Sequence, residues 1–245
     1  MQVLLIRLEA PLISFGAPIV DNMGTIQTWP ALSMLVGLLG NALGYHHRDI
    51  RELQRLQERL RYACRQDRKG RRIQDYQTVD LGSPYLSDEL GWTTRGQLER
   101  RAGGSSRETH IRQRDYWADA MYTIALTLVP ENEKPTSKDL THALEYPERP
   151  LFIGRKSCLP SSPLFAGELQ ADDLLDALLL DLPSDDVDLG KSMLAFWQEE
   201  GPKTSDGHSA RPITDARDWT NQIHVGERWV GSGWISQETG EVHYE

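Results

Sequence analysis

Residues 30–45 (PALSMLVGLLGNALGY) constrain the fold most strongly, because they predict a helix with almost no polar face. Ser33 and Asn41 are the only strongly polar residues in its interior. Pro30 suits a first helical turn, and Gly44 suits the left-handed residue that commonly follows a helix. We therefore expect a helix that the rest of the chain covers on all sides.

Gly37 and Gly40 lie inside this predicted helix, although a glycine costs a helix about 1 kcal/mol relative to alanine. With Gly44 they are spaced three and four residues apart, so they lie near one helical face. Another backbone can approach that face closely, because it carries no side chains. One interpretation is tight packing of helix on sheet, and the other is a bare surface for a nucleic-acid backbone.

The hydrophobic pattern of residues 1–153 predicts an α+β unit, because period-two and helical segments alternate along it. The expected elements are a strand at 2–9 followed by a loop, the glycine helix, an amphipathic helix at 49–60 with outward arginines, a hairpin of 61–66 and 72–79 around DRKG, a strand at 119–129, a helix at 136–145 capped by Thr136 or Ser137, and a strand at 151–153. This order is close to a ferredoxin-like or RNA-recognition-motif plan.

Residues 80–116, called the arm below, interrupt this plan without steady periodicity, so we expect them to leave the core. Residues 154–245 are expected to form a small mixed C-terminal domain. Its predicted elements are a strand at 163–169, an apolar helix at 172–182, an acidic linker at 183–188, and a hairpin of 229–235 and 242–244 with its turn at 238–240.

Several classes of function lack support in the sequence. No apolar run approaches the ~20 residues that span a bilayer, and no signal peptide is evident, so we expect a cytoplasmic protein that does not contact a membrane. Cys64 and Cys158 have no CxxC partner, so neither a disulfide framework nor a cysteine-rich zinc site is supported. The absence of P-loop, HExxH, GxSxG and dinucleotide motifs argues against an enzyme, and we expect neither a cofactor nor a metal.

The charge is distributed unevenly around a formal net charge of −9. Residues 48–72 carry ten Arg or Lys against four Asp or Glu, and residues 95–114 carry six against two. Residues 168–206 carry eleven acidic residues against two lysines. Because local patches decide whether a polyanion binds, the basic segments keep a nucleic-acid partner open.

Two segments carry the chemistry expected of a nucleic-acid surface. RETHIRQRDYWADA offers guanidinium groups for phosphates and rings for stacking, and GRKSCLP places basic and hydroxyl groups directly after a predicted strand. The bland alternative for each is a solvated strand end. The candidate residues are Arg107, His110, Arg112, Arg114, Tyr116 and Trp117 in the first segment, and Arg155, Lys156 and Ser157 in the second.

Five ordered motifs, within roughly residues 1–170, resemble the CasD ("Cas five") family of CRISPR Cascade subunits, and its type I-E branch fits best. They are LEAPLISFG, PALSMLVGLLGNALG, DYQTV, RETHIRQRDYWADAMYTIAL and LFIGRKSCLPSSPLF. The resemblance implies a ferredoxin-like domain of RAMP type whose thumb is the arm. It also implies a non-catalytic subunit that binds the 5′ handle of the guide RNA, caps the backbone-subunit filament and contacts the large subunit, reaching target DNA only through the complex.

Ser33, Gly37 and Gly40 of the glycine helix are also among the expected RNA-binding residues. The resemblance leaves an alternative, because the type I-C branch cleaves precursor guide RNA with a tyrosine, a lysine and a histidine. Tyr45 follows the glycine helix as that tyrosine does, and His46 with His47 would be an acid–base pair or solvated surface. No Lys–His pair follows at a matching place, so a structural subunit is favoured over a metal-independent endoribonuclease or a stand-alone RNA-binding protein.

Overall fold

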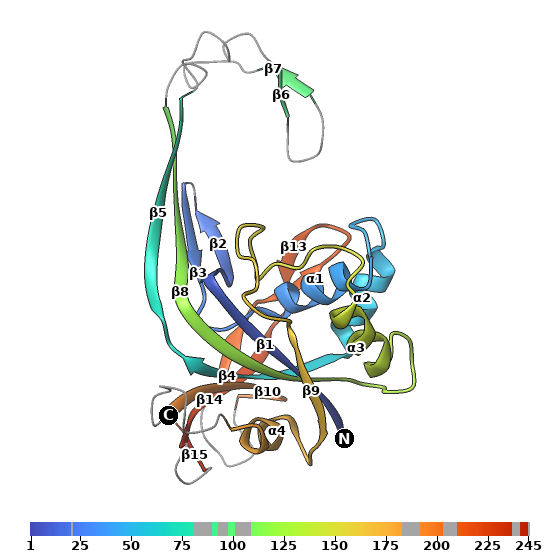
Figure 1. The fold of residues 1–245 in the computed structure, drawn as a ribbon. Helices are drawn as coiled ribbons and strands as arrows, with labels where there is room; N and C mark the ends of the chain where they lie inside the picture. The colour runs from blue at the N-terminus through green and yellow to red at the C-terminus, as the bar shows by residue number, and fades with distance from the viewer. Residues whose placement is uncertain are drawn as a thin grey trace.

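The computed structural model describes residues 1–20, 22–80, 90–92, 98–100, 109–182, 192–202, 210–236 and 241–244. This described part is a mixed α+β fold built around one large twisted sheet (Figure 1). The strands follow one another across the sheet in the order β11 (Arg211–Ile213), β14 (Arg228–Ser236), β10 (Ser192–Glu199), β4 (Leu60–Arg68), β8 (Thr109–Leu128), β1 (Gln2–Ile13) and β9 (Phe165–Gln170).

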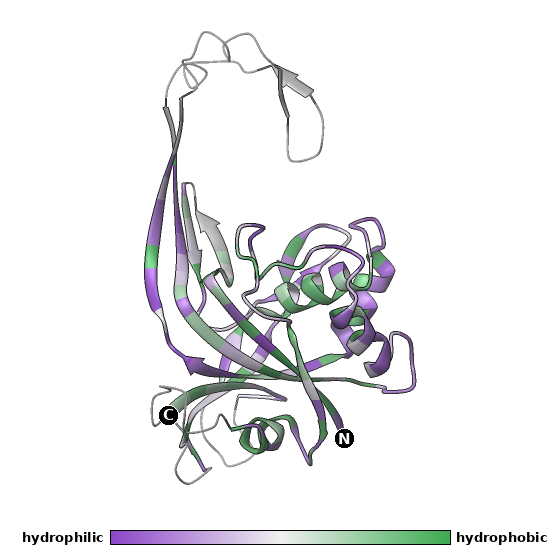
Figure 2. Ribbon diagram, in the orientation of Figure 1, coloured by the Kyte–Doolittle hydropathy of each residue, from purple (hydrophilic) through white to green (hydrophobic). Residues whose placement is uncertain are grey.

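The C-terminal half of β8 is buried on both faces, as the alternation of residues 119–129 predicted. One face carries Tyr122, Ile124, Leu126 and Leu128, and the other carries Met121, Thr123, Ala125 and Thr127. Helices α1 (Leu32–Ala42), α2 (Ile50–Arg59) and α3 (Ser137–Glu145) cover the first face, and α4 (Leu174–Leu180) covers the second (Figure 1). Two layers of hydrophobic residues thus enclose the middle of the sheet (Figure 2).

The glycine helix forms as α1, with two corrections. The helix begins after Ala31, so Pro30 precedes it instead of occupying its first turn, whereas Gly44 does follow it with a left-handed φ of 82°. The expectation that the helix is covered on all sides is wrong. Its outer face remains partly exposed because it borders a pocket, and the residues of that face are Ser33, Met34, Gly37 and Asn41.

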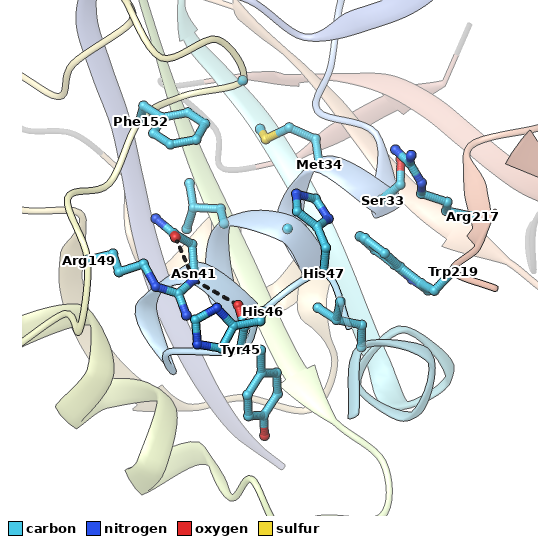
Figure 3. Close-up of a pocket in the computed structure, with 15 residues that line it drawn as sticks. Ser33, Met34, Asn41, Tyr45, His46, His47, Arg149, Phe152, Arg217 and Trp219 are labelled. Carbon is cyan, nitrogen blue, oxygen red and sulfur yellow. Dashed lines mark hydrogen bonds between the residues drawn. The ribbon is translucent and has the colours of Figure 1, made fainter. Parts of the chain in front are cut away.

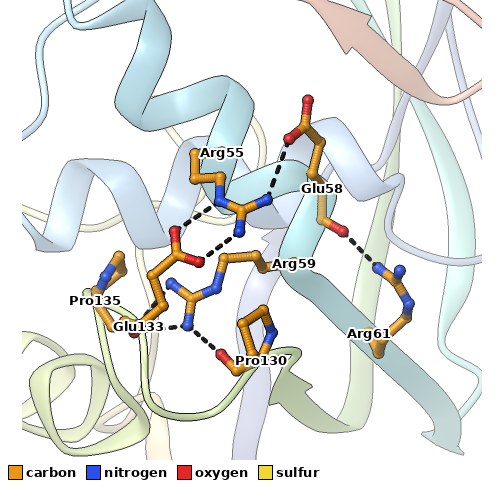
Figure 4. Close-up of polar contacts among 7 residues, drawn as sticks. All are labelled: Arg55, Glu58, Arg59, Arg61, Pro130, Glu133 and Pro135. Atoms are coloured by element: carbon orange, nitrogen blue, oxygen red, sulfur yellow. Dashed lines mark hydrogen bonds and ion pairs between the residues drawn. The ribbon is translucent and has the colours of Figure 1, made fainter.

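The amphipathic helix is confirmed as α2, but the expectation that its arginines point outward is wrong for Arg59. That side chain is fully buried and donates to the carbonyl oxygens of Pro130, Glu133 and Pro135 at 2.6, 2.7 and 3.0 Å (Figure 4). Three backbone acceptors therefore bind the Nη groups of a side chain that a helical pattern assigns to solvent.

The predicted hairpin around DRKG is wrong, although both of its strands exist. β4 and β5 (Arg71–Asp80) do not pair with each other, because both run antiparallel to β8. β4 pairs with the C-terminal half of β8, where Leu60 lies opposite Leu128, and β5 pairs with the N-terminal half, where Arg71 lies opposite Ala118. A β8 of twenty residues is long enough to take both partners in line.

The predicted strand at 151–153 is also wrong, since this segment forms a loop. Ser14 N–H donates to the carbonyl of Ile153 at 3.2 Å, but no ladder follows, because Gly154 turns the chain with φ of 88°. The place beside β1 belongs to β9, the strand expected at 163–169. The helix at 136–145 and its cap are confirmed, with Thr136 Oγ1 accepting from Asp139 N–H at 3.3 Å.

The loop expected after residue 9 is wrong as well. β1 continues to Ile13, and the chain then forms β2 (Gly16–Val20) and β3 (Met23–Ile26). β3 pairs in parallel with β8, and this tertiary partner stabilises a strand that its short sequence does not suggest. Other elements without a clear sequence signal are β10, β11, β12 (Ala216–Asp218) and β13 (Ile223–Val225).

Residues 154–245 add strands to the same sheet. The apolar helix is confirmed as α4, and the final hairpin is confirmed as β14 paired with β15 (Val242–Tyr244). The acidic linker at 183–188 and the turn at 238–240 lie outside the described residues, and the division into domains at 153/154 stays a prediction. Across the described ranges, no helix is both long and apolar enough to span a membrane.

The described residues of the arm are 80, 90–92, 98–100 and 109–116, and the first and last of these ranges belong to a long ribbon. β5 and the N-terminal half of β8 pair from Arg71↔Ala118 to Asp80↔Thr109, and this ribbon extends away from the helices (Figure 1). β6 (Leu90–Trp92) and β7 (Leu98–Arg100) pair with each other. Residues 109–116 belong to β8 and so to the large sheet, which corrects the expected arm boundary on that side.

Candidate nucleic-acid interface

A pocket of about 390 Å³ lies over the exposed face of α1 (Figure 3). Three parts of the chain enclose it: α1 with the loop and helix that follow, the loop at 149–154, and the β12–β13 hairpin. Its lining side chains are Ser33, Met34, Leu38, Asn41, Tyr45, His46, His47, Leu53, Arg149, Phe152, Arg217 and Trp219, and Gly37, Gly40 and Gly154 complete it.

Gly37 and Gly40 have different surroundings, and the close packing at Gly40 is of helix on helix and not of helix on sheet. A methyl group at Gly40 would lie 2.7 Å from Leu53 Cδ2, so this glycine allows α1 and α2 to pack closely. A methyl group at Gly37 would meet nothing within 4 Å. Gly40 therefore serves packing, and Gly37 leaves a bare patch of helix at the floor of the pocket.

Among the described residues, the lining of the pocket contains two arginines and two histidines but no carboxylate. Arg149 is fixed in place, because its Nη1 donates to the carbonyl of Tyr45 at 2.8 Å (Figure 3) and its Nη2 donates to that of Gly44. Arg217 is oriented by Gln222, whose Oε1 accepts from Nη2 at 2.6 Å. In a chain with net charge −9, this lining is locally suited to an anionic ligand.

A buried ion pair from the C-terminal third holds the N-terminus of α1. Asp215 accepts from Leu32 N–H through Oδ2 at 3.0 Å, and its backbone carbonyl accepts from Ser33 N–H at 3.1 Å. Arg228 donates to both oxygens of Asp215, from Nε at 3.0 Å and from Nη2 at 2.6 Å. Since Asp215 already occupies these amides, the helix N-terminus is not a free phosphate site.

The Tyr62 hydroxyl completes this network. It accepts from Arg228 Nη2 at 2.8 Å and donates to the carbonyl of Pro30 at 2.6 Å. Burial alone would lower the pKa of Arg228, but the neighbouring Tyr62 and Asp215 outweigh it and raise the pKa. The guanidinium therefore stays charged, and the start of the glycine helix is tied to β4 and β14.

The GRKSCLP segment divides into engaged and exposed side chains. Arg155 donates from Nη1 to the carbonyl of Asp115 at 2.8 Å and from Nη2 to that of Gly24 at 3.2 Å. Its guanidinium also lies 4.6 Å from the ring centre of Tyr116. Lys156 and Ser157 are exposed. Arg155 thus connects the loop to β3 and β8, while its two successors face solvent.

Most candidate residues of the RETHIRQRDYWADA segment lie within the described ranges. Arg112 and Arg114 lie on the same face of β8 as Tyr116, and Arg112 Nη1 donates to Asn22 Oδ1 at 3.4 Å. His110 pairs with Val79 in the β5–β8 ladder, and Arg107 lies outside the described residues. The structure brings Arg114 and Arg155 together at Gly24, since a methyl group there would meet both side chains.

Tyr45, His46 and His47, the residues of the alternative nuclease hypothesis, are among those that line the pocket. Burial, with help from the carboxylates of Glu52 and Asp139, raises the pKa of Tyr45, so the phenol is protonated at neutral pH. His46 and His47 are exposed. Cys64 and Cys158 are free and buried, and no group of three or more His, Cys, Asp or Glu in the described ranges is placed to hold a metal ion.

Sequence reasoning missed the wall of the pocket opposite α1. Phe152 was assigned to a strand, and Arg217, Trp219 and Asp215 were assigned no role. The only available signal was the pairing of Arg with Trp in ARDWT, which is a weak indication of a binding surface. Nothing in the sequence indicated that this segment contacts a helix more than 180 residues away.

The sequence matches a family model described as CRISPR-associated protein (Cas_Cas5) over residues 3–231. A curated relative, the CRISPR system Cascade subunit CasD of Escherichia coli (strain K12), is 35% identical over 176 residues, which are 72% of this chain and 75% of the relative.

Solved structures share the fold. A chain of a CRISPR RNA-guided surveillance complex aligns with a TM-score of 0.66 at 22% identity, over 95% of this chain and 89% of that one. A crystal structure of a Cas protein aligns with a TM-score of 0.63 at 25% identity, over 96% of both chains.

Proposed function

We infer the function from one premise: the chain belongs to the Cas5 family of CRISPR-associated proteins. We propose that it is the CasD-type subunit of a type I-E surveillance complex, since its relative in Escherichia coli is named as a Cascade subunit. In this proposal the chain is a non-catalytic, cytoplasmic subunit. It holds the 5′ handle of the guide RNA and supports binding of target DNA only through the assembled complex.

We propose a ferredoxin-like unit of RAMP type as the core of this subunit. Its four strands are β4, β8, β1 and β9, in that order and with antiparallel neighbours. α1 and α2 connect β1 to β4, and α3 connects β8 to β9, which supports a β-α-β-β-α-β plan. Residues 1–153 would carry most of this unit, and residues 154–245 would form the small C-terminal domain.

The observation that carries the RNA-binding proposal is the lining over the bare face of α1, which holds two arginines and, within the described part of the chain, no carboxylate. This pocket includes Gly154, and the exposed Lys156 and Ser157 follow directly in the chain. Arg155 then leads to Arg114 on β8. A single RNA strand laid from Ser33 and Gly37 along the 154–157 loop to β8 would meet the Ser33 hydroxyl, the exposed Lys156 and Ser157, and Arg114.

The remaining partners follow from the arm and from the charge distribution. We propose that the arm contacts the guide RNA and the backbone subunit next to it, so that the chain caps the backbone filament. The acidic stretch 168–206 suits a protein neighbour or solvent better than RNA. We propose the large subunit as a further protein partner of the exposed surface of the chain. No cofactor, metal or membrane enters this proposal.

Equilibrium binding of labelled guide RNA tests the proposal. We expect the full chain to bind RNA with its 5′ handle more tightly than the same RNA with a scrambled handle. Lys156→Ala should weaken binding and reduce the salt slope by roughly 0.7, the value for one phosphate contact on a single strand. Lys138→Ala, an exposed lysine on α3, is the matched control. Equal affinity for both RNAs would contradict handle binding.

A second incubation addresses the endoribonuclease alternative. Repeat RNA mixed with the chain in EDTA should remain intact under this proposal, because the Tyr45 phenol is protonated and the described lining of the pocket holds no lysine beside it. A cut product that disappears in Tyr45→Phe would replace the structural role with nuclease activity.

A further inference from the structure

We infer that the pocket over α1 receives one unstacked base of the bound RNA strand, and that the C-terminal β12–β13 hairpin supplies one of its walls. This inference rests on the proposed function and goes beyond it, because it names a base pocket and assigns a binding role to Arg217 and Trp219. The RNA-binding residues expected from the sequence all lie before residue 158.

The size and floor of the pocket suit a flat group. Its volume of about 390 Å³ lies near the lower end of the ~300–1,000 Å³ range of small-ligand pockets. Gly37 leaves the floor open, since no atom lies within 4 Å of the position that a methyl group would take there. A single base therefore fits, whereas a helix or a duplex does not.

The walls offer planar side chains from separate elements. Phe152 comes from the loop before Gly154, His47 from the loop after α1, and Trp219 from the turn after β12, and all three surround the same space (Figure 3). Single-stranded nucleic acids are commonly held by stacking of bases on aromatic side chains. Arg149 and Arg217 stand on opposite sides of this space, where they favour the phosphates on either side of the base (Figure 3).

Two buried donors on the hairpin wall lack acceptors. Trp219 is only 4% exposed, and its Nε1–H has no hydrogen-bond partner among the described residues. The Nε–H of Arg217 is buried and unpartnered in the same way. Unpaired buried donors are costly, so an acceptor is expected to reach them when the site fills. Because both atoms are covered in the free chain, the hairpin must shift slightly to bring a base edge to them.

The charge of the lining favours RNA over a protein side chain as the occupant. An apolar side chain of a partner protein could pack against Met34, Phe152 and Trp219, but it would form no charged contact with the two arginines. A base brings its own phosphates, and no described residue of the lining is a carboxylate that would repel them. A protein anchor is therefore one outcome of the test and not the proposal.

A double-mutant cycle between protein and RNA tests this inference. Each handle nucleotide is replaced in turn by an abasic one, and affinity is measured for the wild-type chain and for Phe152→Ala. We expect one abasic position to weaken wild-type binding about 5- to 150-fold, the loss of one stacked base. At that position Phe152→Ala should cause little further loss, because the stacking partner is already absent.

Other variants keep the outcome interpretable. His47 is exposed, so His47→Ala should show the same coupling without a risk to folding. Tyr146 is an exposed aromatic residue outside the pocket, so Tyr146→Ala should show no coupling. Trp219→Phe keeps a ring but removes the donor, and should weaken binding less than Trp219→Ala.

The results separate the base pocket from handle binding. If the wild-type chain prefers handle RNA but no abasic position couples to Phe152 or His47, the base pocket is overturned while the proposed function stands. If the pocket variants leave RNA binding unchanged but block assembly with the other subunits, the occupant is a protein side chain. If the chain does not prefer handle RNA at all, the proposed function itself fails.

Discussion

Asp215→Asn should destabilise the chain, because it removes one partner of a buried ion pair. The side chains of Asp215 and Arg228 are 11% and 9% exposed, and two charged hydrogen bonds join them. Removing one partner of a buried pair costs about 3–5 kcal/mol. The amide oxygen of asparagine can still accept from Leu32 N–H, so we expect the lower end, about 3 kcal/mol.

Urea unfolding and thermal melting measure this loss. For a chain of this size, a loss of about 3 kcal/mol lowers Tm by about 6–12 °C. Asp172→Asn, at an exposed aspartate on the opposite side of the sheet, is the matched control and should leave Tm unchanged. Because Asp215 also positions the start of α1, affinity for handle RNA should fall at temperatures where the variant remains folded.

The double variant Asp215→Asn with Arg228→Met completes the test. Removing both charges leaves no unpaired buried ion, so we expect the double variant to be more stable than the sum of the single losses predicts. A loss below about 1 kcal/mol for Asp215→Asn, or purely additive losses in the double variant, would show that this pair does not hold the helix.

Three further predictions follow from the described residues. Gly37→Ala should leave the stability of the free chain unchanged or slightly raised in urea unfolding but should weaken binding of handle RNA. Gly40→Ala should destabilise the free chain, because the methyl group meets Leu53. If Gly37→Ala destabilised the chain and Gly40→Ala did not, the bare floor at Gly37 would be contradicted. Burial raises the pKa of Asp181 above its ordinary 3.8 even though Arg65 and Arg7 oppose this, so the folded state favours the protonated form and loses stability as pH rises. Asp181→Asn should therefore raise the midpoint of urea unfolding at pH 7, with the gain vanishing below about pH 4, and a gain independent of pH would refute the cause. Replacing residues 84–104 by a short Gly-Ser turn should leave Tm unchanged, because β6 and β7 pair only with each other among the described strands. The same variant should fail to assemble with guide RNA and backbone subunits. An unfolded variant, or one that assembles normally, would contradict the role of the arm.

Local periodicity predicted much of the fold correctly. α2, α3 and α4 formed where amphipathic or capped segments indicated them, and β8 presented the two faces that its alternation predicted. These elements depend on neighbours within a few residues, which the sequence displays directly. The family resemblance drawn from ordered motifs was confirmed by the match over residues 3–231.

Errors arose where distant partners decide the structure. Arg59 is buried because three carbonyls from residues 130–135 converge on it, and β3 exists because β8 lies beside it. The false hairpin at DRKG came from a turn signal that the length of β8 overrides. Periodicity carries no information about such contacts.

In the candidate site, too, local signals were predicted from the sequence and contacts with distant residues were not. The glycine helix was identified from its sequence, but the different roles of Gly37 and Gly40 depend on Leu53, which packs only on the second. The GRKSCLP triplet was found, whereas the internal role of Arg155 depends on Asp115 and Gly24. The C-terminal wall of the pocket was not predictable, because it meets α1 only through the fold.

The sharing of β8 between body and ribbon has a consequence for how this family of chains can change in length. A strand alternates its side chains with a period of two, so one residue inserted between the ribbon and the core half of β8 would turn Arg112 and Arg114 to the opposite face while leaving Tyr122 in the core. Viable insertions in this strand should therefore come in pairs, or be absorbed by a bulge. The ribbon can grow or shrink in evolution, but its basic face remains linked to the body in steps of two residues.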